Sequence, residues 1–275
     1  MSESTPPPPD TSERPLSFLG AAGWTLLAAI LFAGTLEGIE SVHPGALGDF
    51  VTVGAAKVAA CSIVLFAILR VHEPETSVRQ VLALRRPALV VFFLAVLLGA
   101  CLAIPATWIE ELIALKFPVT PKEAEAVEHL LATPAKRWVL VVSLTIIMPV
   151  CDDLLFRGAI FTLLKRTAKL DTVVFATAAL NVLMAPEWRQ FPSIFVMLLA
   201  ASWMRAMTAS VVPSIAARIT FFALLYAPAA LGRDGPPTSK PVVAAALLGA
   251  AIALAGIGAV SRRDPRTLDA RVDDV

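Results

Sequence analysis

The sequence predicts an all-α, polytopic membrane protein with about eight transmembrane helices. Of its 275 residues, 57% are hydrophobic and only 16% are charged, whereas soluble domains carry about 25% charged residues. The hydrophobic residues form blocks of about 17–22, the length that a helix needs to cross a bilayer core about 30 Å thick. Helices that surround one soluble core would show narrower apolar stripes instead.

Three regions follow from this pattern. Residues 1–15 are polar and rich in proline, so we expect a disordered tail without a signal peptide. We expect a helical membrane domain over residues 16–260 and a tail of basic and acidic residues over 261–275. The expected spans, of which the fifth and sixth are short for complete crossings, cover about Leu16–Leu36, Phe50–Leu69, Pro87–Trp108, Trp138–Leu164, Thr172–Ala185, Pro192–Met207, Val211–Ala227 and Pro241–Val260.

The longest connection between spans, Ile109–Arg137, carries its own helix signal. The run Thr120–Glu123 (TPKE) has the form of a capping box with proline at the first helical position. We expect a short amphipathic helix on the membrane surface that ends at Pro134. Its apolar face is expected to consist of residues at helical spacing, namely Ala124, Val127, Leu130 and Leu131.

Single residues within or beside the other spans also carry structural signals. Asp171 is the expected N-cap of the fifth span, and Pro186 and Pro228 are expected to end helices. Lys57 lies within the second span. We expect its side chain to reach water or the lipid headgroups, and pairing with another side chain is the alternative.

The charge distribution predicts the orientation of the chain. With eight crossings, thirteen Lys and Arg residues fall on the side of the two termini and seven on the other side. The positive-inside rule therefore predicts that both termini are cytoplasmic. The net charge of +1 argues against a nucleic-acid partner and leaves the lipid bilayer as the expected one. The three cysteines all lie in apolar runs, so no disulfide framework is expected.

The ionisable residues within the spans need partners, because an ionised side chain in a bilayer costs about 2.5–3.5 kcal/mol. Asp153 and Arg157 are four residues apart and share a helix face. Asp152 points about 100° away and needs a partner on another helix. Arg218 in the seventh span is the candidate, and Asn181 in the fifth is a further polar residue. The two aspartates and two arginines sum to zero charge, as a buried structural network requires.

Metal chemistry is not expected at these positions. His43, His72 and His129 lie in predicted loops, so no helix offers a histidine-based zinc site. Aspartate and asparagine beside two arginines form a poor site for a hard cation. Asp152 and Asp153 also diverge on one helix, whereas the two carboxylates of an aspartic protease must face each other. We expect no metal and no cofactor, and paired structural charges remain one interpretation.

Three motifs resemble the CPBP family, the CAAX-protease and bacteriocin-processing group of membrane proteins. The run Asp152–Gly158 (DDLLFRG) is similar to the family motif Glu-Glu-x-x-x-Arg with aspartate for both glutamates. The family's Phe-x-x-x-His motif corresponds to Thr177–Asn181, with asparagine in the histidine position. Its His-x-x-x-Asn motif and lead-in correspond to Thr208–Phe222, with Arg218 and Phe222 in the two motif positions. The resemblance covers a core of residues 75–228 and implies the family's eight-span fold.

The resemblance implies a glutamate-type intramembrane protease site whose residues have changed. In active members the first glutamate activates a water with a histidine, and the other histidine and the asparagine stabilise the oxyanion. Here Asp152 is one methylene shorter, and Asn181 has no pKa suited to proton transfer. Arg218 would hold the carboxylate in an ion pair, and Phe222 cannot donate a hydrogen bond to an oxyanion. Arg157 is as in the family.

We therefore expect a catalytically degenerate homologue in a bacterial inner (plasma) membrane, which binds a protein or peptide client in the cavity of its protease relatives. The alternative is a divergent intramembrane endopeptidase of CAAX or sorting type, with Asp152 as base and Asn181 and Ser214 as auxiliaries. A transporter is a third class, although the sequence lacks a pair of discontinuous helices in matching halves. The candidate site residues, at the motif positions, are Asp152, Asp153, Arg157, Asn181 and Arg218.

Overall fold

The computed structural model describes residues 15–46, 49–121, 125, 133–185, 187–231 and 238–264, and every regular element in these ranges is helical. This confirms the all-α polytopic membrane fold. Within these ranges, six helical segments are long and apolar enough to cross a membrane, and the counterparts of the fifth and seventh predicted spans, Leu170–Val182 and Val212–Tyr226, are shorter. The six are Phe18–Val42, Phe50–His72, Leu89–Lys116, Ala135–Leu164, Trp188–Thr208 and Lys240–Ser261.

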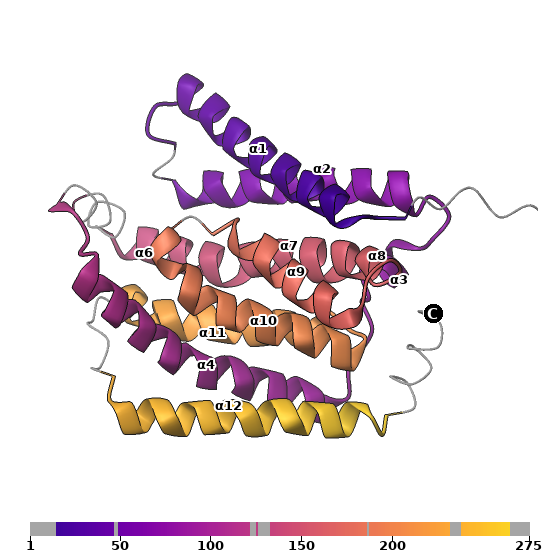
Figure 1. Ribbon diagram of the computed structural model, residues 1–275. Coiled ribbons are helices and arrows are strands. Elements are labelled where there is room, and N and C mark those ends of the chain that lie inside the picture. The colour runs from indigo at the N-terminus through magenta and orange to yellow at the C-terminus, as the bar shows by residue number, and fades with distance from the viewer. Residues whose placement is uncertain are drawn as a thin grey trace, which may run out of the picture.

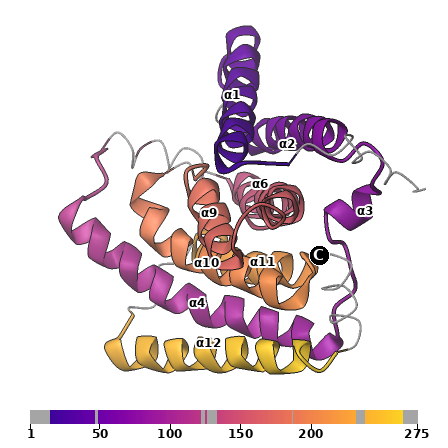
Figure 2. The same ribbon diagram turned by 45° about the vertical axis from the view of Figure 1, so that its right-hand side comes forward.

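The helices form three layers (Figures 1 and 2). Helices α1 (Phe18–Val42) and α2 (Phe50–His72) cover one side, and α4 (Leu89–Lys116) and α12 (Lys240–Ser261) cover the other. Helix α1 begins and α12 ends at the same end of the bundle (Figure 1). The short α3 (Val78–Val81) follows α2, and the middle layer contains α6 (Pro134–Val142), α7 (Met148–Asp153), α8 (Phe161–Leu164), α9 (Leu170–Val182), α10 (Phe191–Thr208) and α11 (Val212–Leu231).

One long segment, Ala135–Leu164, runs through the middle layer and changes its winding twice. Between α6 and α7 lies the π-helix η2 (Ser143–Ile147), and between α7 and α8 lies the π-helix η3 (Leu154–Ile160). Every residue of η3 except Leu154 is buried. π-Helices are wider than α-helices and occur frequently at functional sites, so the two stretches around α7 mark the region that the sequence motifs indicated.

The predicted end of the third span is wrong. This span does not end at Trp108, because α4 continues to Lys116. Pro105 lies inside this helix, and neighbouring helices in a membrane can satisfy the backbone groups that a proline frees. Pro134 begins α6, where Thr133 is the N-cap and accepts a hydrogen bond from the backbone N–H of Lys136, and the helix expected to end before it lies mostly outside the described residues. Proline is well suited to the first helical position.

Two further capping predictions are wrong. The N-cap of α9 is Lys169, and Asp171 lies in the first turn, where its charge is favourable at the positive end of the helix dipole. Pro228 lies inside α11 rather than after it.

The α2 N-cap, Asp49, accepts hydrogen bonds from two backbone N–H groups and from the Thr52 hydroxyl. The hydroxyl contact lowers the pKa of Asp49 below its usual value.

Some predictions lie outside the described residues. The proline-rich tail falls almost wholly within residues 1–14, and the charged tail mostly within 265–275. Most of the predicted surface helix, with its apolar face, falls within 122–132, and Pro186 is also outside the described ranges.

Glycine allows close helix contacts at two points that position the middle layer. A Cβ atom at Gly99 of α4 would lie 2.1 Å from the carbonyl oxygen of Ala217 in α11. A Cβ atom at Gly158, the glycine of the DDLLFRG run, would lie 3.0 Å from a methyl carbon of Leu82. Side chains at these positions would push apart backbones that the apolar core holds together. Both glycines thus fix elements that surround the central segment.

Candidate functional site

The candidate site centres on Asp153, whose side chain is completely buried in α7. Its Oδ1 accepts hydrogen bonds from the guanidinium groups of Arg157, one helical turn along, and of Arg218 on α11 at 2.7 Å. The predicted pairing of Asp153 with Arg157 is confirmed. Since a buried charge is stable only when it is paired and hydrogen-bonded, Asp153 is the internal anion that holds two cations.

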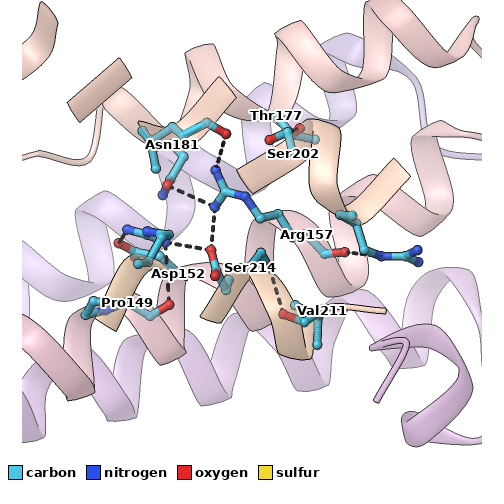
Figure 3. Close-up of polar contacts among 12 residues, drawn as sticks. Pro149, Asp152, Arg157, Thr177, Asn181, Ser202, Val211 and Ser214 are labelled. Carbon is cyan, nitrogen blue, oxygen red and sulfur yellow. Dashed lines mark hydrogen bonds and ion pairs between the residues drawn. The ribbon is translucent and has the colours of Figure 1, made fainter. Parts of the chain in front are cut away.

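Arg157 connects this carboxylate to two other helices. Its Nη1 lies 3.4 Å from Oδ1 of Asn181 on α9, and its Nη2 donates to the carbonyl oxygen of Leu198 on α10 at 2.8 Å. Figure 3 shows the Arg157 side chain reaching toward Asn181. The backbone carbonyl of Arg157, within the π-helix η3, accepts a hydrogen bond from Nε of Arg205 at 3.0 Å. The one arginine that matches the family motif therefore has a structural role in joining α9, α10 and the central segment.

Asp152 faces other helices, as its position next to Asp153 predicts. Its Oδ1 forms an ion pair with Nζ of Lys57 on α2 at 2.7 Å, and its Oδ2 lies 3.4 Å from Nη2 of Arg218. The predicted partnership with Arg218 is confirmed, although Arg218 lies closer to Asp153. Both oxygens of the Asp152 carboxylate thus face a cation.

The expectation that Lys57 reaches water or the headgroups is wrong. The residue is 2% exposed, and its ammonium group lies 5.5 Å from the centre of the Phe32 ring in addition to its contact with Asp152. The pairing alternative is the correct one, because the ammonium group lies between Phe32 of α1 and Asp152 of α7. The cluster therefore holds three cations and two carboxylates, and not the balanced four charges expected from the sequence.

Asn181 lies where the family has a histidine, and it is 3% exposed. Its Oδ1 accepts from Arg157, which fixes the orientation of the amide. Its Nδ2 has no hydrogen-bond partner among the described residues. A buried amide donor without a partner is uncommon and calls for an explanation. Asn181 thus offers Nδ2 as an unpaired hydrogen-bond donor, but unlike histidine its side chain does not titrate.

Arg218 and Phe222 occupy the positions of the third motif, one helical turn apart on α11. The guanidinium carbon of Arg218 lies 5.7 Å from the centre of the Phe222 ring, which in turn stacks on Tyr226 with a centroid distance of 5.9 Å. Ser214, proposed as an auxiliary group in the alternative mechanism, donates its hydroxyl proton to the carbonyl oxygen of Val211 at 2.7 Å. That hydroxyl satisfies the first turn of α11 and does not reach Asp152.

A cavity of about 290 Å³ adjoins the charge cluster. Three of the predicted site residues line it, Asp152, Asn181 and Arg218, whereas Asp153 and Arg157 lie behind its wall. The remaining lining is mostly apolar and comes from α1, α2, η2, α7, α10, α11 and the connection after α9. The predicted residues are therefore one connected group, of which only part faces the space where a ligand could lie.

Sequence reasoning missed three buried polar residues. Lys57 is buried in α2 although solvent was expected around it, and Arg205, near the end of the sixth predicted span, is buried in α10. His72 was placed in a loop but is the last residue of α2, where its Nε2 accepts a hydrogen bond from the Trp24 indole N–H at 3.1 Å. For Lys57 the sequence carried no decisive signal, because its ion pair with Asp152 is a tertiary contact between α2 and α7.

The comparisons with known proteins agree with the motifs. The family model described as Type II CAAX prenyl endopeptidase Rce1-like matches residues 134–224. This segment is Rce1-like. The match begins at the start of α6 and extends into α11, so it contains all five predicted site residues. The resemblance expected from the three motifs is confirmed, together with an integral membrane location. The comparisons found no match among curated proteins or solved structures.

Proposed function

We propose that this protein is a catalytically degenerate homologue of the CAAX proteases, which binds a client segment in its cavity without cleaving it. The observation that carries the proposal is the state of Asp152. This residue stands where the family's water-activating glutamate is expected, and both of its oxygens are in contact with cations, Lys57 and Arg218. A general base must take a proton from water, and the two adjacent cations oppose this because they stabilise the ionised carboxylate.

The other motif positions support the same proposal. Asn181 holds an amide where a proton-transferring histidine would stand, and an amide does not exchange protons near neutral pH. The Phe222 ring lies against Arg218 and Tyr226, so it supplies no donor for an oxyanion. The cavity nevertheless retains a space of about 290 Å³ beside these residues, so the capacity to bind is separate from the capacity to cleave.

The size of the cavity limits which part of a client it can hold. A complete transmembrane helix is about 10 Å wide and about 30 Å long, which is far larger than a space of about 290 Å³. An extended stretch of a few residues at the end of a client is of the right size. We therefore propose a protein client that inserts an extended terminal segment.

Photo-crosslinking in native membranes tests the proposal. A photoreactive amino acid at Phe222, which lines the cavity, is expected to form covalent adducts with a protein. Phe93 on α4 is the matched control, because it is a phenylalanine that is 67% exposed on the outside of the helix bundle. Adducts only with lipid at position 222, or the same protein adducts at both positions, would argue against a client in the cavity.

The alternative function is that of a divergent endopeptidase, and the exposure of Asp152 to the cavity favours it. Cleavage of membrane peptides by the purified protein, lost in Asp152→Ala but kept in a variant of an exposed residue such as Lys116→Ala, would support this function. Cleavage that is unchanged in Asp152→Ala would remove Asp152 from the reaction and with it this alternative.

We further propose that the protein lies in a bacterial inner membrane with both termini in the cytoplasm. The excess of Lys and Arg on one side supports this orientation, as does the location of the start of α1 and the end of α12 at the same end of the bundle. In a variant without native cysteines, a membrane-impermeant thiol reagent added to spheroplasts should label Ser41→Cys and not Glu75→Cys. Labelling of Glu75→Cys alone would indicate the opposite orientation.

A further inference from the structure

We propose that the cavity beside Asp152 binds a single-chain lipid with a carboxylate head, such as a long-chain fatty acid. The inference rests on the proposed function only in taking the cavity as a binding site that does not cleave its ligand. It adds a small-molecule ligand class to that site, and it is argued from the charge of the cluster, from its unused donors and from the composition of the cavity wall.

The charge of the cluster leaves one cation in excess. Lys57, Arg157 and Arg218 are joined by direct ion pairs to Asp152 and Asp153. These five side chains carry a net charge of +1, and all are buried among apolar helices. An uncompensated buried charge is unfavourable, and it favours an incoming group with one negative charge. A monoanionic head placed against Lys57 and Arg218 would neutralise the cluster.

Two hydrogen-bond donors on the cavity wall have no partner among the described residues. They are Nδ2 of Asn181 and Nε of Arg218, and both residues line the cavity and are 3% exposed. Both atoms can donate a hydrogen bond but cannot accept one. A carboxylate offers acceptors only and can accept from several donors at once. Oδ1 of Asp152, an acceptor on the same wall without a hydrogen-bond partner among the described residues, is held by its ion pair with Lys57. The two unpaired donors and the excess cation are therefore suited to the same kind of group.

The rest of the wall is suited to a hydrocarbon chain. Apolar side chains from at least five helices line it, including Phe32, Val53, Met148, Leu198 and Phe222. A volume of about 290 Å³ is near the lower limit for ligand sites, which span about 300–1,000 Å³. One acyl chain with a small planar head fits this description better than a bulky phospholipid headgroup. The surrounding bilayer holds such amphiphiles at high local concentration.

A matched pair of photoreactive probes tests the inference. The full-length protein in phosphatidylcholine nanodiscs is illuminated with a diazirine derivative of dodecanoate or of dodecanol, and the labelled peptides are identified by mass spectrometry. The two probes differ only in the head group. We expect dodecanoate to label the cavity-lining peptides about tenfold more than dodecanol, because charge-assisted hydrogen bonds are about twice as strong as neutral ones. Equal labelling of these peptides by the two probes would overturn the proposal without any variant.

Three variants examine the origin of the preference. Lys57→Met makes the cluster neutral, so the two probes should then label the cavity-lining peptides about equally. The control Lys116→Met removes an exposed lysine at the end of α4 and should leave the preference for dodecanoate unchanged. Asn181→Leu removes one donor without changing the charge and should lower dodecanoate labelling but not dodecanol labelling. A preference that survives in both cavity variants contradicts the proposal.

The outcome is separable from that of the proposed function. Client binding is read from protein adducts at position 222 in native membranes, whereas lipid binding is read from probe adducts on purified protein. The two ligands would compete for one cavity of about 290 Å³. Protein adducts at position 222 with equal labelling by the two probes would support the client alone, whereas a preference for dodecanoate without protein adducts would support the lipid alone.

Discussion

The two adjacent aspartates provide a test of the network by identical changes at neighbouring positions. Asp153→Asn and Asp152→Asn each remove one negative charge, keep the size of the side chain and lie on the same short helix, α7. Each variant leaves three cations and one carboxylate. A difference in their stability must therefore arise from the surroundings of the two side chains and not from the net charge.

The structure predicts a large difference. The side chain of Asp153 is completely buried and its Oδ1 holds both Arg157 and Arg218, so its loss breaks two buried ion pairs. Breaking one buried pair costs about 3–5 kcal/mol, and Asp153→Asn should cost at least that much. The side chain of Asp152 is 12% exposed and borders the cavity. Because water in the cavity can solvate Lys57 after the substitution, we expect Asp152→Asn to cost about 1–2 kcal/mol.

Unfolding in mixed micelles of a mild detergent and sodium dodecyl sulfate, followed by tryptophan fluorescence, gives both free energies of unfolding. The reasoning requires Asp153→Asn to be less stable than Asp152→Asn by about 2 kcal/mol or more. Equal losses would refute the inference that Asp153 is the internal anion of the cluster. A larger loss for Asp152→Asn would assign that role to the other aspartate.

Three further stability predictions can be checked with the same unfolding measurement. Gly99→Ala should cost about 1–3 kcal/mol by overpacking. At Gly34 a Cβ atom meets nothing within 4 Å, so Gly34→Ala should stabilise the protein by about 0.5–1 kcal/mol. Equal effects of the two substitutions would contradict the close contact of α4 with α11. Lys57→Met and Asp152→Asn should couple by about 0.5–3 kcal/mol in a double-mutant cycle, and strictly additive losses would show that the two side chains do not interact. Asp49→Ala should cost about 1 kcal/mol at neutral pH. The pKa of Asp49 is lowered in the folded state, so this cost should persist above the unfolded pKa of about 3.9 and disappear as the pH falls through the folded pKa. A cost that stays constant as the pH falls through both pKa values would contradict the role of the ionised Asp49 as the N-cap.

The sequence was sufficient for the fold class and for the core of the site. The spacing of hydrophobic blocks follows directly from the thickness of a bilayer. Each predicted span overlaps helical residues, and six of the helical segments among the described residues are long enough to cross a membrane. The pairing of Asp153 with Arg157 could be predicted because residues four apart share a helix face. The pairing of Asp152 with Arg218 followed from charge, since an intramembrane aspartate needs a cation.

The ends of helices and the role of Lys57 could not be predicted in the same way. A lysine stem can reach the surface or stay buried, and the choice depends on which helix lies next to it. The contact between α2 and α7 is tertiary and has no local signal. The end of α4 was predicted eight residues early, at Trp108, because the two glutamates that follow it resemble a loop, although Glu110 accepts a hydrogen bond from Ser193 on α10.

The excess charge of the cluster could not be predicted either, because the contact of Lys57 with Asp152 is tertiary. Four charges could be paired from the sequence and they summed to zero. The fifth, Lys57, changes the sum to +1 and with it the chemistry expected of the cavity. A single tertiary contact therefore separates a closed structural network from a site that attracts an anion.

If the cavity binds a client without cleaving it, the captured client must be intact. The protein adduct formed from a photoreactive residue at position 222 is purified, and the client is sequenced to both of its ends by mass spectrometry. We expect a full-length client, identical in adducts from the parent protein and from Asp152→Ala. A client that is truncated next to the crosslinked segment in the parent protein, but intact in Asp152→Ala, would contradict the claim and establish Asp152 as a catalytic residue.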